Sequence, residues 1–397
     1  MSSPNGKATA VQFGAGNIGR SFVGQLFARA GYEVVFVDVD PVLVAELNRR
    51  RGYRVEVHDD PPGELLVEHV RAVDGHDREA VARELAEADL GASAVGPSAL
   101  PHLLPALAAG LLARGERPLD FIIAENLRGA PQLIREGLAG LLPPGYPLAK
   151  RLGLVETSIG KMVPIMPEAV RRQDPLLVYA EAYNTLILDR RGFLGPVPEV
   201  PGLDPQDNIA AYVDRKAFIH NLGHAAAAYA AYALDPGLVF LWQAMARPQV
   251  SGLAGRAMGE SAQALLAEYP GEWTPEELGE HSADLLRRFA NRALGDTVYR
   301  VGRDLPRKLS PGDRLVGALR LQQRHGVDPA ATCTAIALAL RFRAADEQGE
   351  VFPADEAFAQ RLEAAGPAQV LREVCGLEPD DPATCRIIAA FREPRLA

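Results

Sequence analysis

One segment near the middle of the sequence carries side chains that suit acid–base chemistry. Lys216, His220, Asn221 and His224 stand within nine residues of one another. On an α-helix of 3.6 residues per turn all four lie on one side, opposite Phe218. This arc offers an amine that can act as a base, an amide and two imidazoles. The pattern predicts either a catalytic helix that lines a cavity or a polar face turned to solvent.

Two further features favour the catalytic interpretation of this helix. Lysine supplies only five of the 42 basic residues, and arginine supplies the others. Arginine keeps its proton in proteins, whereas a desolvated lysine can lose it, so a lysine within such a motif carries weight. The continuation, 225–233, consists of alanine and tyrosine, which is typical of a close-packed core helix rather than a surface helix.

A glycine motif near the start of the chain, Gly14-Ala15-Gly16-Asn17-Ile18-Gly19, lies between a predicted strand and a predicted helix. In the GxGxxG pattern the first glycine permits a tight turn, the second lets a pyrophosphate approach, and the third packs helix on sheet. Asp38 ends the next predicted strand, where it can bind the ribose hydroxyls and repel a 2′-phosphate. We therefore predict an NAD site, with a turn that binds no nucleotide as the alternative. The residues predicted to bind the cofactor here are Gly14, Gly16, Asn17, Ile18, Gly19 and Asp38.

Two later loops follow predicted strands and fit the same site. Val95, Gly96 and Pro97 follow an apolar strand, and their backbone is predicted to border the nicotinamide. Asn126 follows the strand 120–124, again at the carboxyl end, where doubly wound sheets bind ligands. Asn126 is predicted to contact the cofactor and to take part in catalysis. The alternative is a turn-forming asparagine.

A compact basic set near the C-terminal third is predicted to bind a substrate phosphate. Arg303, Arg307 and Lys308 stand close together in a chain whose net charge is −9. Arginine pairs with phosphate in a bidentate way, and lysine acts as a point charge. The alternative is that these cations pair with Asp304, with Asp313 or with a helix end.

The sequence predicts no metal site. The eight histidines are scattered without an HExxH pattern, and the three cysteines lack metal-ligand spacing. The cysteines also give no disulfide framework, which favours a reducing compartment and a cytoplasmic protein. The first seven residues are polar, which argues against a secretory signal, and no apolar run approaches the length of a membrane span.

Composition and hydrophobic pattern predict two folded domains. Hydrophobic residues make up 48% and charged residues 23% of 397 residues, which excludes wholesale disorder. The acidic balance argues against a nucleic-acid or membrane partner and leaves a small-molecule substrate; a monomer and a homodimer remain open. Residues 1–195 alternate strand and helix patterns, which predicts a Rossmann-type doubly wound parallel sheet, and residues 196–397 predict a mainly α-helical domain. The longest predicted helices in that second half are 209–234, 244–269 and 275–293, and a single late β segment is predicted over 176–188.

The motifs together resemble a known family. The spacing Lys216-x4-Asn221-x2-His224 matches the signature of the polyol-specific long-chain dehydrogenases. The stretches FGAGNIGR (13–20), AENLRGA (124–130) and VGRDLPRKLSPGDRL (301–315) are similar to the mannitol-1-phosphate 5-dehydrogenase branch, in family order. The length also fits that branch better than the longer mannitol 2-dehydrogenases and hexuronate reductases.

The resemblance implies a reaction and a role for each motif residue. The reaction is the reversible, zinc-independent oxidation of D-mannitol 1-phosphate by NAD+ to D-fructose 6-phosphate and NADH. Lys216 would be the general base, and the acid in reverse, if its surroundings lower its pKa from about 10.4 to about 7–8. Asn221, with Asn126, would donate hydrogen bonds to the developing alkoxide, and His224 would orient substrate hydroxyls or Lys216. A packing role is expected for His220.

One stretch departs from the family pattern and leaves the exact substrate open. Gly160-Lys161 stands where the family commonly has an Asp-Arg pair, and Lys161 is predicted to contact a phosphate or a carboxylate. Three alternatives remain: an oxidoreductase for an unphosphorylated polyol or hexuronate, a β-hydroxyacid dehydrogenase of the 6-phosphogluconate type, and a non-catalytic NAD(H) sensor. Closer Lys–Asn spacing in the hydroxyacid class counts against the second, and an unexplained Lys216 set counts against the third.

Overall fold

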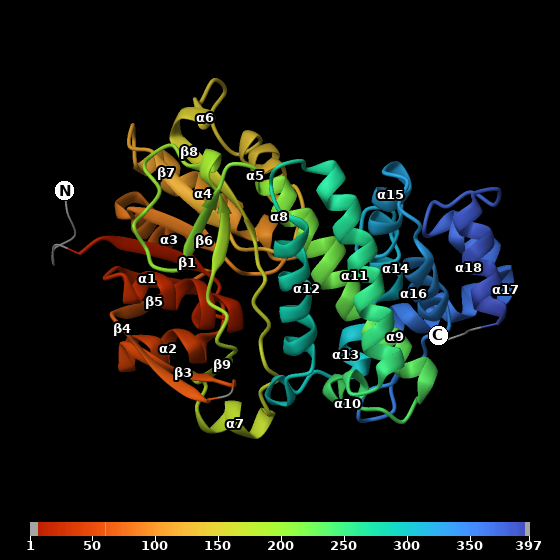
Figure 1. Ribbon diagram of the computed structural model, residues 1–397. Coiled ribbons are helices and arrows are strands. Elements are labelled where there is room, and N and C mark those ends of the chain that lie inside the picture. The colour runs from red at the N-terminus through yellow and green to blue at the C-terminus, as the bar shows by residue number, and fades with distance from the viewer. Residues whose placement is uncertain (1–6, 60, 394–397) are drawn as a thin grey trace. The chain divides into compact units, whose positions relative to one another are not determined.

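The computed structural model describes residues 7–59 and 61–393 of the chain (Figure 1). Its contacts gather into two compact units, Met1–Val213 and Asp214–Ala397. The division falls later in the sequence than the domain boundary predicted after residue 195. The strand β11 (Leu203–Gln206) accounts for the difference, because it pairs with β10 (Leu186–Asp189) and so belongs to the sheet of the first unit.

In the described part of the first unit, one sheet of eight strands has the order β11-β10-β8-β7-β6-β1-β2-β5. From β5 to β8 all neighbouring strands are parallel, and their order is that of a Rossmann sheet. β10 joins β8 in the antiparallel direction. The predicted doubly wound fold is therefore confirmed. The strands are β1 (Thr9–Phe13), β2 (Glu33–Asp38), β5 (Val70–Asp74), β6 (Leu90–Ser93), β7 (Leu119–Ile123), β8 (Leu152–Ser158), β10 (Leu186–Asp189) and β11 (Leu203–Gln206).

The central strands of this sheet are buried on both faces. Successive residues of β2 alternate between two hydrophobic clusters, with Val34 and Phe36 in one and Val35 and Val37 in the other. This alternation follows from the two-residue period of a strand. Helices cover both faces, which explains why the strands read as continuous apolar runs in the sequence.

A small second sheet completes the strands of the first unit. Its order is β4-β3-β9, with β3 antiparallel to β4 and parallel to β9. The β segment predicted over 176–188 divides between the two sheets, because β9 ends at Ala180 and β10 begins at Leu186. The strands of the small sheet are β3 (Gly52–Val57), β4 (Gly63–Glu68) and β9 (Val178–Ala180).

The helix after the glycine motif differs from the prediction, because it begins with π-helical turns. The helix predicted after the glycine motif consists mainly of the π-helix η1 (Gly19–Gly24) followed by α1 (Gln25–Arg29). The next helix, α2, follows the expected rules, with Asp40 as a side-chain N-cap and Pro41 in the first turn. The remaining helices of this unit are α2 (Pro41–Arg50), α3 (Arg78–Glu87), α4 (Leu100–Ala113), α5 (Ala130–Ala139), α6 (Leu148–Arg151), α7 (Glu168–Gln173), η2 (Arg190–Gly192) and α8 (Ile209–Arg215), which crosses the division.

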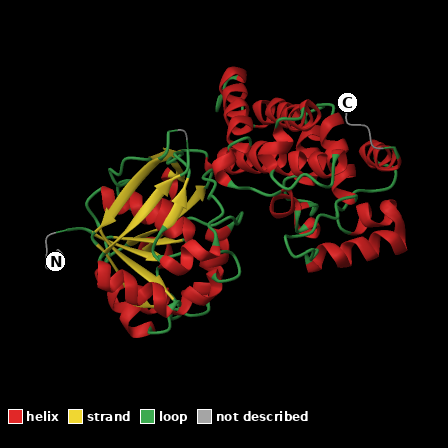
Figure 2. Cartoon of the chain, turned by 90° about the horizontal axis from the view of Figure 1, so that it is seen from below, coloured by secondary structure: helices red, strands yellow, loops and turns green. Residues whose placement is uncertain are grey.

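The second unit is helical, as predicted, and the strands drawn in yellow in Figure 2 all belong to the first unit. The predicted helix 244–269 is interrupted at Arg247, because Pro248 begins a new helix at a position where no N–H is needed. The helices are η3 (Lys216–Asn221), α9 (Leu222–Leu234), α10 (Leu241–Met245), α11 (Pro248–Glu268), α12 (Pro275–Phe289), η4 (Arg292–Leu294), α13 (Val298–Gly302), α14 (Leu305–Lys308), α15 (Val316–Arg324), α16 (Ala330–Leu340), α17 (Pro353–Glu373) and α18 (Pro382–Arg392).

Helix α9 forms the centre of the second unit. Its alanines from Ala225 to Ala231 are completely or almost completely buried, and α10, α11, α13 and α16 pack around it. The hydroxyl of Tyr229 donates to the carbonyl of Gly302 at 3.0 Å, which ties α9 to the end of α13. Among the described helices, none has the length and hydropathy needed to cross a lipid bilayer.

The close approach of α15 to η3 generates a prediction about stability. A methyl group at Gly317 would lie 2.7 Å from the ring of Phe218 and 3.0 Å from the carbonyl oxygen of Gly312. We expect Gly317→Ala to lower the free energy of unfolding by about 1–3 kcal/mol, because the helices must separate. Urea unfolding followed by circular dichroism measures this change.

Gly279→Ala is the matched control for this substitution. Gly279 is exposed on α12, and a methyl group there would meet nothing within 4 Å, so its replacement should be neutral or slightly stabilising. Equal midpoints for both variants would show that α15 does not depend on this contact.

Candidate active site

The glycine motif adopts the conformation that its sequence predicts. Gly14 has φ +88°, and a methyl group there would lie 2.5 Å from the carbonyl oxygen of Ala94. A methyl group at Gly19 would collide with the carbonyl of Gly14. The first and third glycines are therefore required by the fold of the loop itself, since any side chain would displace β6 or η1.

Gly16 differs from the other two glycines of the motif. A methyl group there would meet no protein atom within 4 Å, and both Gly16 and Asn17 are exposed. Ile18 is half-buried against the hydrophobic core. Nothing in the fold therefore requires a glycine at position 16, whereas a ligand that approaches the backbone would require one. This open backbone fits a dinucleotide pyrophosphate.

Asp38 fixes the glycine loop at the end of β2. Its Oδ2 accepts a hydrogen bond from the N–H of Ala15 at 2.6 Å, and its Oδ1 accepts one from Asp40 at 2.9 Å. A carboxylate has about four acceptor positions, so two remain for ribose hydroxyls. The predicted ribose-binding residue thus also holds the loop that the phosphates would contact.

A buried carboxylate, Glu125, ties together the two later loops predicted at this site. Its Oε1 accepts from the N–H of Val95 at 2.9 Å, and its Oε2 accepts from Gly96 at 2.8 Å. Burial raises the pKa of Glu125, while these N–H groups oppose the rise. Asn126 follows it and is exposed, as is Pro97. Sequence reasoning did not assign Glu125 a role, although it stands within the stretch 124–130.

Lys161 lies inside the first unit, near η1. Its Nζ donates to the carbonyl of Tyr183 at 2.8 Å and to Oδ1 of Asn184 at 3.1 Å, and it stands 5.1 Å from the centre of the Phe22 ring. Only 8% of the residue is exposed. In the structure this lysine therefore binds protein oxygens and lies beside Phe22 of η1.

Lys216 begins the π-helix η3 in the second unit. The N–H of Leu222 bonds to the carbonyl of Ala217, five residues back, which is the π pattern. The turn is wider than the α-helix assumed in the sequence prediction, and such turns are frequent at functional sites. Burial lowers the pKa of Lys216 to about 7, assisted by Arg314 and Arg307 and opposed by Asp313.

The charges near Lys216 form a connected group. The main-chain N–H and Nε of Arg314 donate to Oδ1 of Asp313 at 2.6 and 2.7 Å. Arg307 pairs with the other oxygen of Asp313, at 3.5 Å, and with Asp304. The structure thus brings one predicted phosphate-binding residue, Arg307, into electrostatic contact with the predicted base. Asp313 and Arg314 were missed as site residues, although both stand in the stretch 301–315.

His224 follows on α9 and faces a carboxylate. Its Nε2 lies 3.3 Å from Oδ2 of Asp296, and its ring stacks on Phe289 with centroids 4.6 Å apart. His220 is buried beside the same phenylalanine, and burial holds its pKa well below the ordinary value. Asn221 is half-buried at the end of η3. Asp296 could not be recognised from the sequence, because it lies outside every motif.

The three predicted phosphate-binding cations have different surroundings. Lys308 is buried and donates to the carbonyls of Val301, at 2.7 Å, and Arg303, so it caps the end of α13. The guanidinium of Arg303 lies over the rings of Tyr299 and Phe352. Arg307 remains about half exposed.

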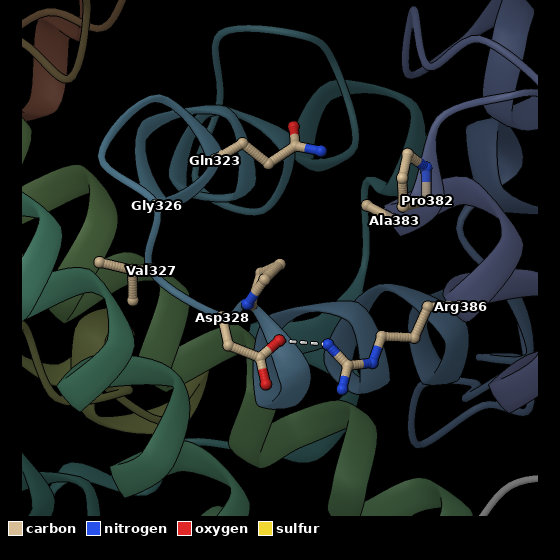
Figure 3. Close-up of a pocket in the computed structure, with 8 residues that line it drawn as sticks. Gln323, Gly326, Val327, Asp328, Pro382, Ala383 and Arg386 are labelled. Atoms are coloured by element: carbon tan, nitrogen blue, oxygen red, sulfur yellow. Dashed lines mark hydrogen bonds and ion pairs between the residues drawn. The ribbon is translucent and has the colours of Figure 1, made fainter.

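A separate cleft of about 480 Å³ lies in the second unit between α15, the loop 326–329 that leads into α16, and α18 (Figure 3). An ion pair between Asp328 and Arg386 crosses it. None of the predicted site residues lines this cleft. The residues that line it are Gln323, Gly326, Val327, Asp328, Pro329, Pro382, Ala383 and Arg386. Within the part of the chain that the structure describes, no group of three or more histidine, cysteine, aspartate or glutamate side chains is arranged to hold a metal ion.

The contrast between Gly14 and Gly16 generates a prediction about cofactor binding. We expect Gly16→Ala to weaken NADH binding by about 10-fold or more, because the methyl group fills the space that the pyrophosphate needs, while the melting temperature stays unchanged. Gly14→Ala should instead lower the melting temperature, since φ is positive and Ala94 blocks the side chain. NADH fluorescence titration and thermal unfolding measure the two effects.

Gly279→Ala again serves as the control, with unchanged NADH affinity and unchanged fold. Tight NADH binding by the Gly16→Ala protein would contradict the assignment of this loop to the pyrophosphate.

Comparisons with known proteins agree with this architecture. The family model described as the mannitol dehydrogenase Rossmann domain matches residues 8–202, and the mannitol dehydrogenase C-terminal domain matches residues 208–379. A protein from Brevibacillus brevis named mannitol-1-phosphate 5-dehydrogenase is 38% identical over 84% of this chain and 86% of its own length. A Bacillus licheniformis protein of the same name is 35% identical over 94% of this chain and 96% of its own length.

Solved structures share the fold at low identity. Mannitol 2-dehydrogenase from Pseudomonas fluorescens, solved as a ternary complex with NAD and D-mannitol, has a TM-score of 0.76 and 18% identity and covers 98% of this chain and 93% of its own. D-sorbitol dehydrogenase has the same TM-score and 16% identity, with coverage of 97% and 93%. The family models span most of the sequence, and the curated relatives exceed 30% identity. The chain therefore belongs to the mannitol dehydrogenase family, and the sequence-based prediction of an NAD-dependent dehydrogenase is confirmed.

Proposed function

We propose that the protein catalyses the reversible oxidation of D-mannitol 1-phosphate to D-fructose 6-phosphate with NAD+ as the oxidant, and without a metal ion. The observation that carries this proposal is Lys216, a lysine whose pKa lies near 7 on a helix with Asn221 and His224. The names of the curated relatives support the choice of the phosphorylated hexitol. Cytoplasmic location and a monomer or homodimer stay predictions.

The chemistry of this chain's residues centres on one proton. In oxidation the neutral Nζ of Lys216 takes the proton of the substrate hydroxyl while the adjacent C–H bond breaks. NAD+, when bound, accepts the hydride from that carbon. Asn221 donates its amide N–H to the oxygen as negative charge develops, and Asn126 is predicted to share this role. In reduction the ammonium form of Lys216 returns the proton.

The residues proposed to hold NAD lie in the first unit. The backbone around Gly16 fits the pyrophosphate, and the free acceptor positions of Asp38 fit the ribose hydroxyls. A carboxylate at this position repels a 2′-phosphate, so NAD is favoured over NADP. Val95, Gly96 and Pro97 are proposed to border the nicotinamide, with Glu125 holding the loop.

Among the cations proposed to bind the substrate phosphate, Arg307 has the strongest support. It is about half exposed and oriented by Asp304 and Asp313, and its charge acts on Lys216. Arginine can bind phosphate with two parallel hydrogen bonds. Arg303 and Lys308 belong to the same proposed set. The guanidinium of Arg303 lies over the Phe352 ring, and Lys308 donates to the carbonyl of Val301 at the end of α13.

The pKa of Lys216 generates a prediction about pH dependence. Oxidation needs the neutral amine, so its kcat/KM should rise with pH through about 7 and then level off, whereas kcat/KM for reduction should fall through the same pH. Arg314→Gln removes a positive neighbour, raises the pKa of Lys216 and moves both curves to higher pH. Initial rates between pH 5.5 and 9.5 measure these curves.

Lys216→Met tests the same assignment directly. It should lose about 10²- to 10⁴-fold in kcat while NADH binding is retained, and Lys150→Met, at an exposed position, should match the unmodified protein. An active Lys216→Met enzyme would contradict the role of Lys216. A pH profile of kcat/KM that Arg314→Gln does not shift would contradict it as well. A non-catalytic NAD(H) sensor would be indifferent to all three substitutions.

The proposed phosphate contact generates a prediction about substrate choice. NADH oxidation at 340 nm, with EDTA present, should be fastest with D-fructose 6-phosphate and much slower with D-fructose or D-fructuronate. Arg307→Gln should lower kcat/KM for the phosphorylated ketose by about 10- to 100-fold more than it changes kcat/KM for D-fructose, because only the phosphate loses a hydrogen bond between charged groups, whereas the effect of Arg307 on the pKa of Lys216 is common to both substrates. Arg303→Gln should lower kcat/KM for the phosphorylated ketose by a smaller factor.

Arg172→Gln is the control, since Arg172 is an exposed surface residue of the first unit. Equal rates with all three ketoses, or a loss in Arg307→Gln that does not depend on the phosphate, would assign the substrate to the unphosphorylated alternatives.

A further inference from the structure

Asp296 is the acidic group that faces His224. Contacts of both its backbone and its side chain hold it in place. Only 5% of the residue is exposed. Its carbonyl accepts from the N–H of Leu241 at 2.8 Å, and its Oδ1 pairs with Arg300, one helical turn further on. The next residue, Thr297, caps α13 by accepting from the N–H of Arg300 at 3.1 Å.

The charge of Asp296 persists despite its burial. Burial alone would raise the pKa of this carboxyl, but His224 and Arg300 outweigh it, and the pKa is lowered. At neutral pH the carboxylate is ionised and can only accept hydrogen bonds. Burial also lowers the pKa of His224, although Asp296 opposes that shift. The pair is therefore a carboxylate beside a neutral imidazole.

A neutral imidazole next to a carboxylate has one favoured tautomer. Nε2 is the ring nitrogen 3.3 Å from Oδ2 of Asp296. It is buried and makes no well-directed hydrogen bond within the described residues, so this carboxylate oxygen is the charged group that it faces. The proton is best placed there, because a lone pair on Nε2 would face a negative oxygen. Nδ1 is then left as an acceptor. Phe289, stacked at 16° to the ring, restricts rotation of the imidazole out of this plane.

We propose that Asp296 is a positioning residue for the reaction, which holds His224 as the Nε2–H tautomer so that Nδ1 accepts a hydrogen bond from a substrate hydroxyl. The inference about the hydroxyl rests on the proposed function, whereas the inference about the tautomer does not. A polyol substrate presents hydroxyl groups that can donate hydrogen bonds. An acceptor with a fixed direction favours a substrate whose hydroxyl stands on the matching carbon.

Asp296→Asn tests the proposal with little change of shape. Asparagine can donate its amide N–H to Nε2, which favours the opposite tautomer and turns Nδ1 into a donor. Long-range ¹H–¹⁵N correlation spectra of the ligand-free protein report the tautomer, and the missing signal in His224→Gln assigns the ring. We expect Nε2–H in the unmodified protein and a shift toward Nδ1–H in Asp296→Asn. An Nδ1–H ring in the unmodified protein, or the same tautomer in both, overturns the proposal.

Steady-state kinetics test whether Asp296 acts through His224. Asp296→Asn should lower kcat for D-fructose 6-phosphate by at least about 10-fold, with NADH affinity unchanged. In a His224→Ala background the same substitution should have no further effect, because residues that act as a unit are non-additive. Additive losses would mean that Asp296 acts only through the fold or through Arg300, and would overturn the positioning role.

Asp284→Asn is the matched control, since Asp284 also pairs with arginines on a helix but stands partly exposed on α12. It should match the unmodified protein in both measurements. If the unmodified protein fails to reduce D-fructose 6-phosphate while Asp296→Asn still switches the tautomer, the substrate assignment fails and the positioning of His224 stands. A switched tautomer with unchanged kcat on an active enzyme overturns the functional role of Asp296.

Discussion

The loss of hydration at the half-buried Lys216 is the constraint on which the proposed chemistry of the second unit depends. A buried ammonium loses hydration worth several kcal/mol, and a lysine in such a position gives up its proton instead. Arg314 and Arg307 add positive charge that pushes in the same direction. Those arginines are themselves neutralised by Asp313 and Asp304. These ion pairs balance the positive charge of the two guanidinium groups that act on the amine of Lys216.

This arrangement requires helices that approach one another closely. The absence of a side chain at Gly317 lets α15 pack against Phe218 of η3, and Arg314 lies just before α15 in the chain. The π-turn at Lys216–Asn221 carries one residue more per hydrogen-bonded ring than an α-helix does. The wider turn therefore lies in the segment that carries the proposed catalytic residues Lys216 and Asn221.

Local sequence patterns predicted the elements whose residues are required by the local fold. Gly14, Gly19 and Asp38 are required by the loop itself, so the motif and the Rossmann sheet could be predicted together. Lys216 stood out because lysine is rare in this chain. Glu125 and Asp296 could not be predicted, since each acts on residues about 30 or 70 positions away that only the fold brings near. Periodicity likewise could not show that 176–188 divides between two sheets, because its apolar residues suit either one.

Both units use a buried carboxylate to fix functional groups, but the two carboxylates respond differently to burial. Glu125 holds the Val95–Gly96 backbone through neutral N–H dipoles. The effect of burial outweighs that of these dipoles, so the pKa of Glu125 is raised. Asp296 faces the full positive charge of Arg300 and the neutral ring of His224, and its pKa is lowered. Dipoles offset part of the cost of a buried charge, whereas an opposite charge offsets more of it. The group that must stay ionised to hold a histidine tautomer is therefore the one that the fold pairs with an arginine.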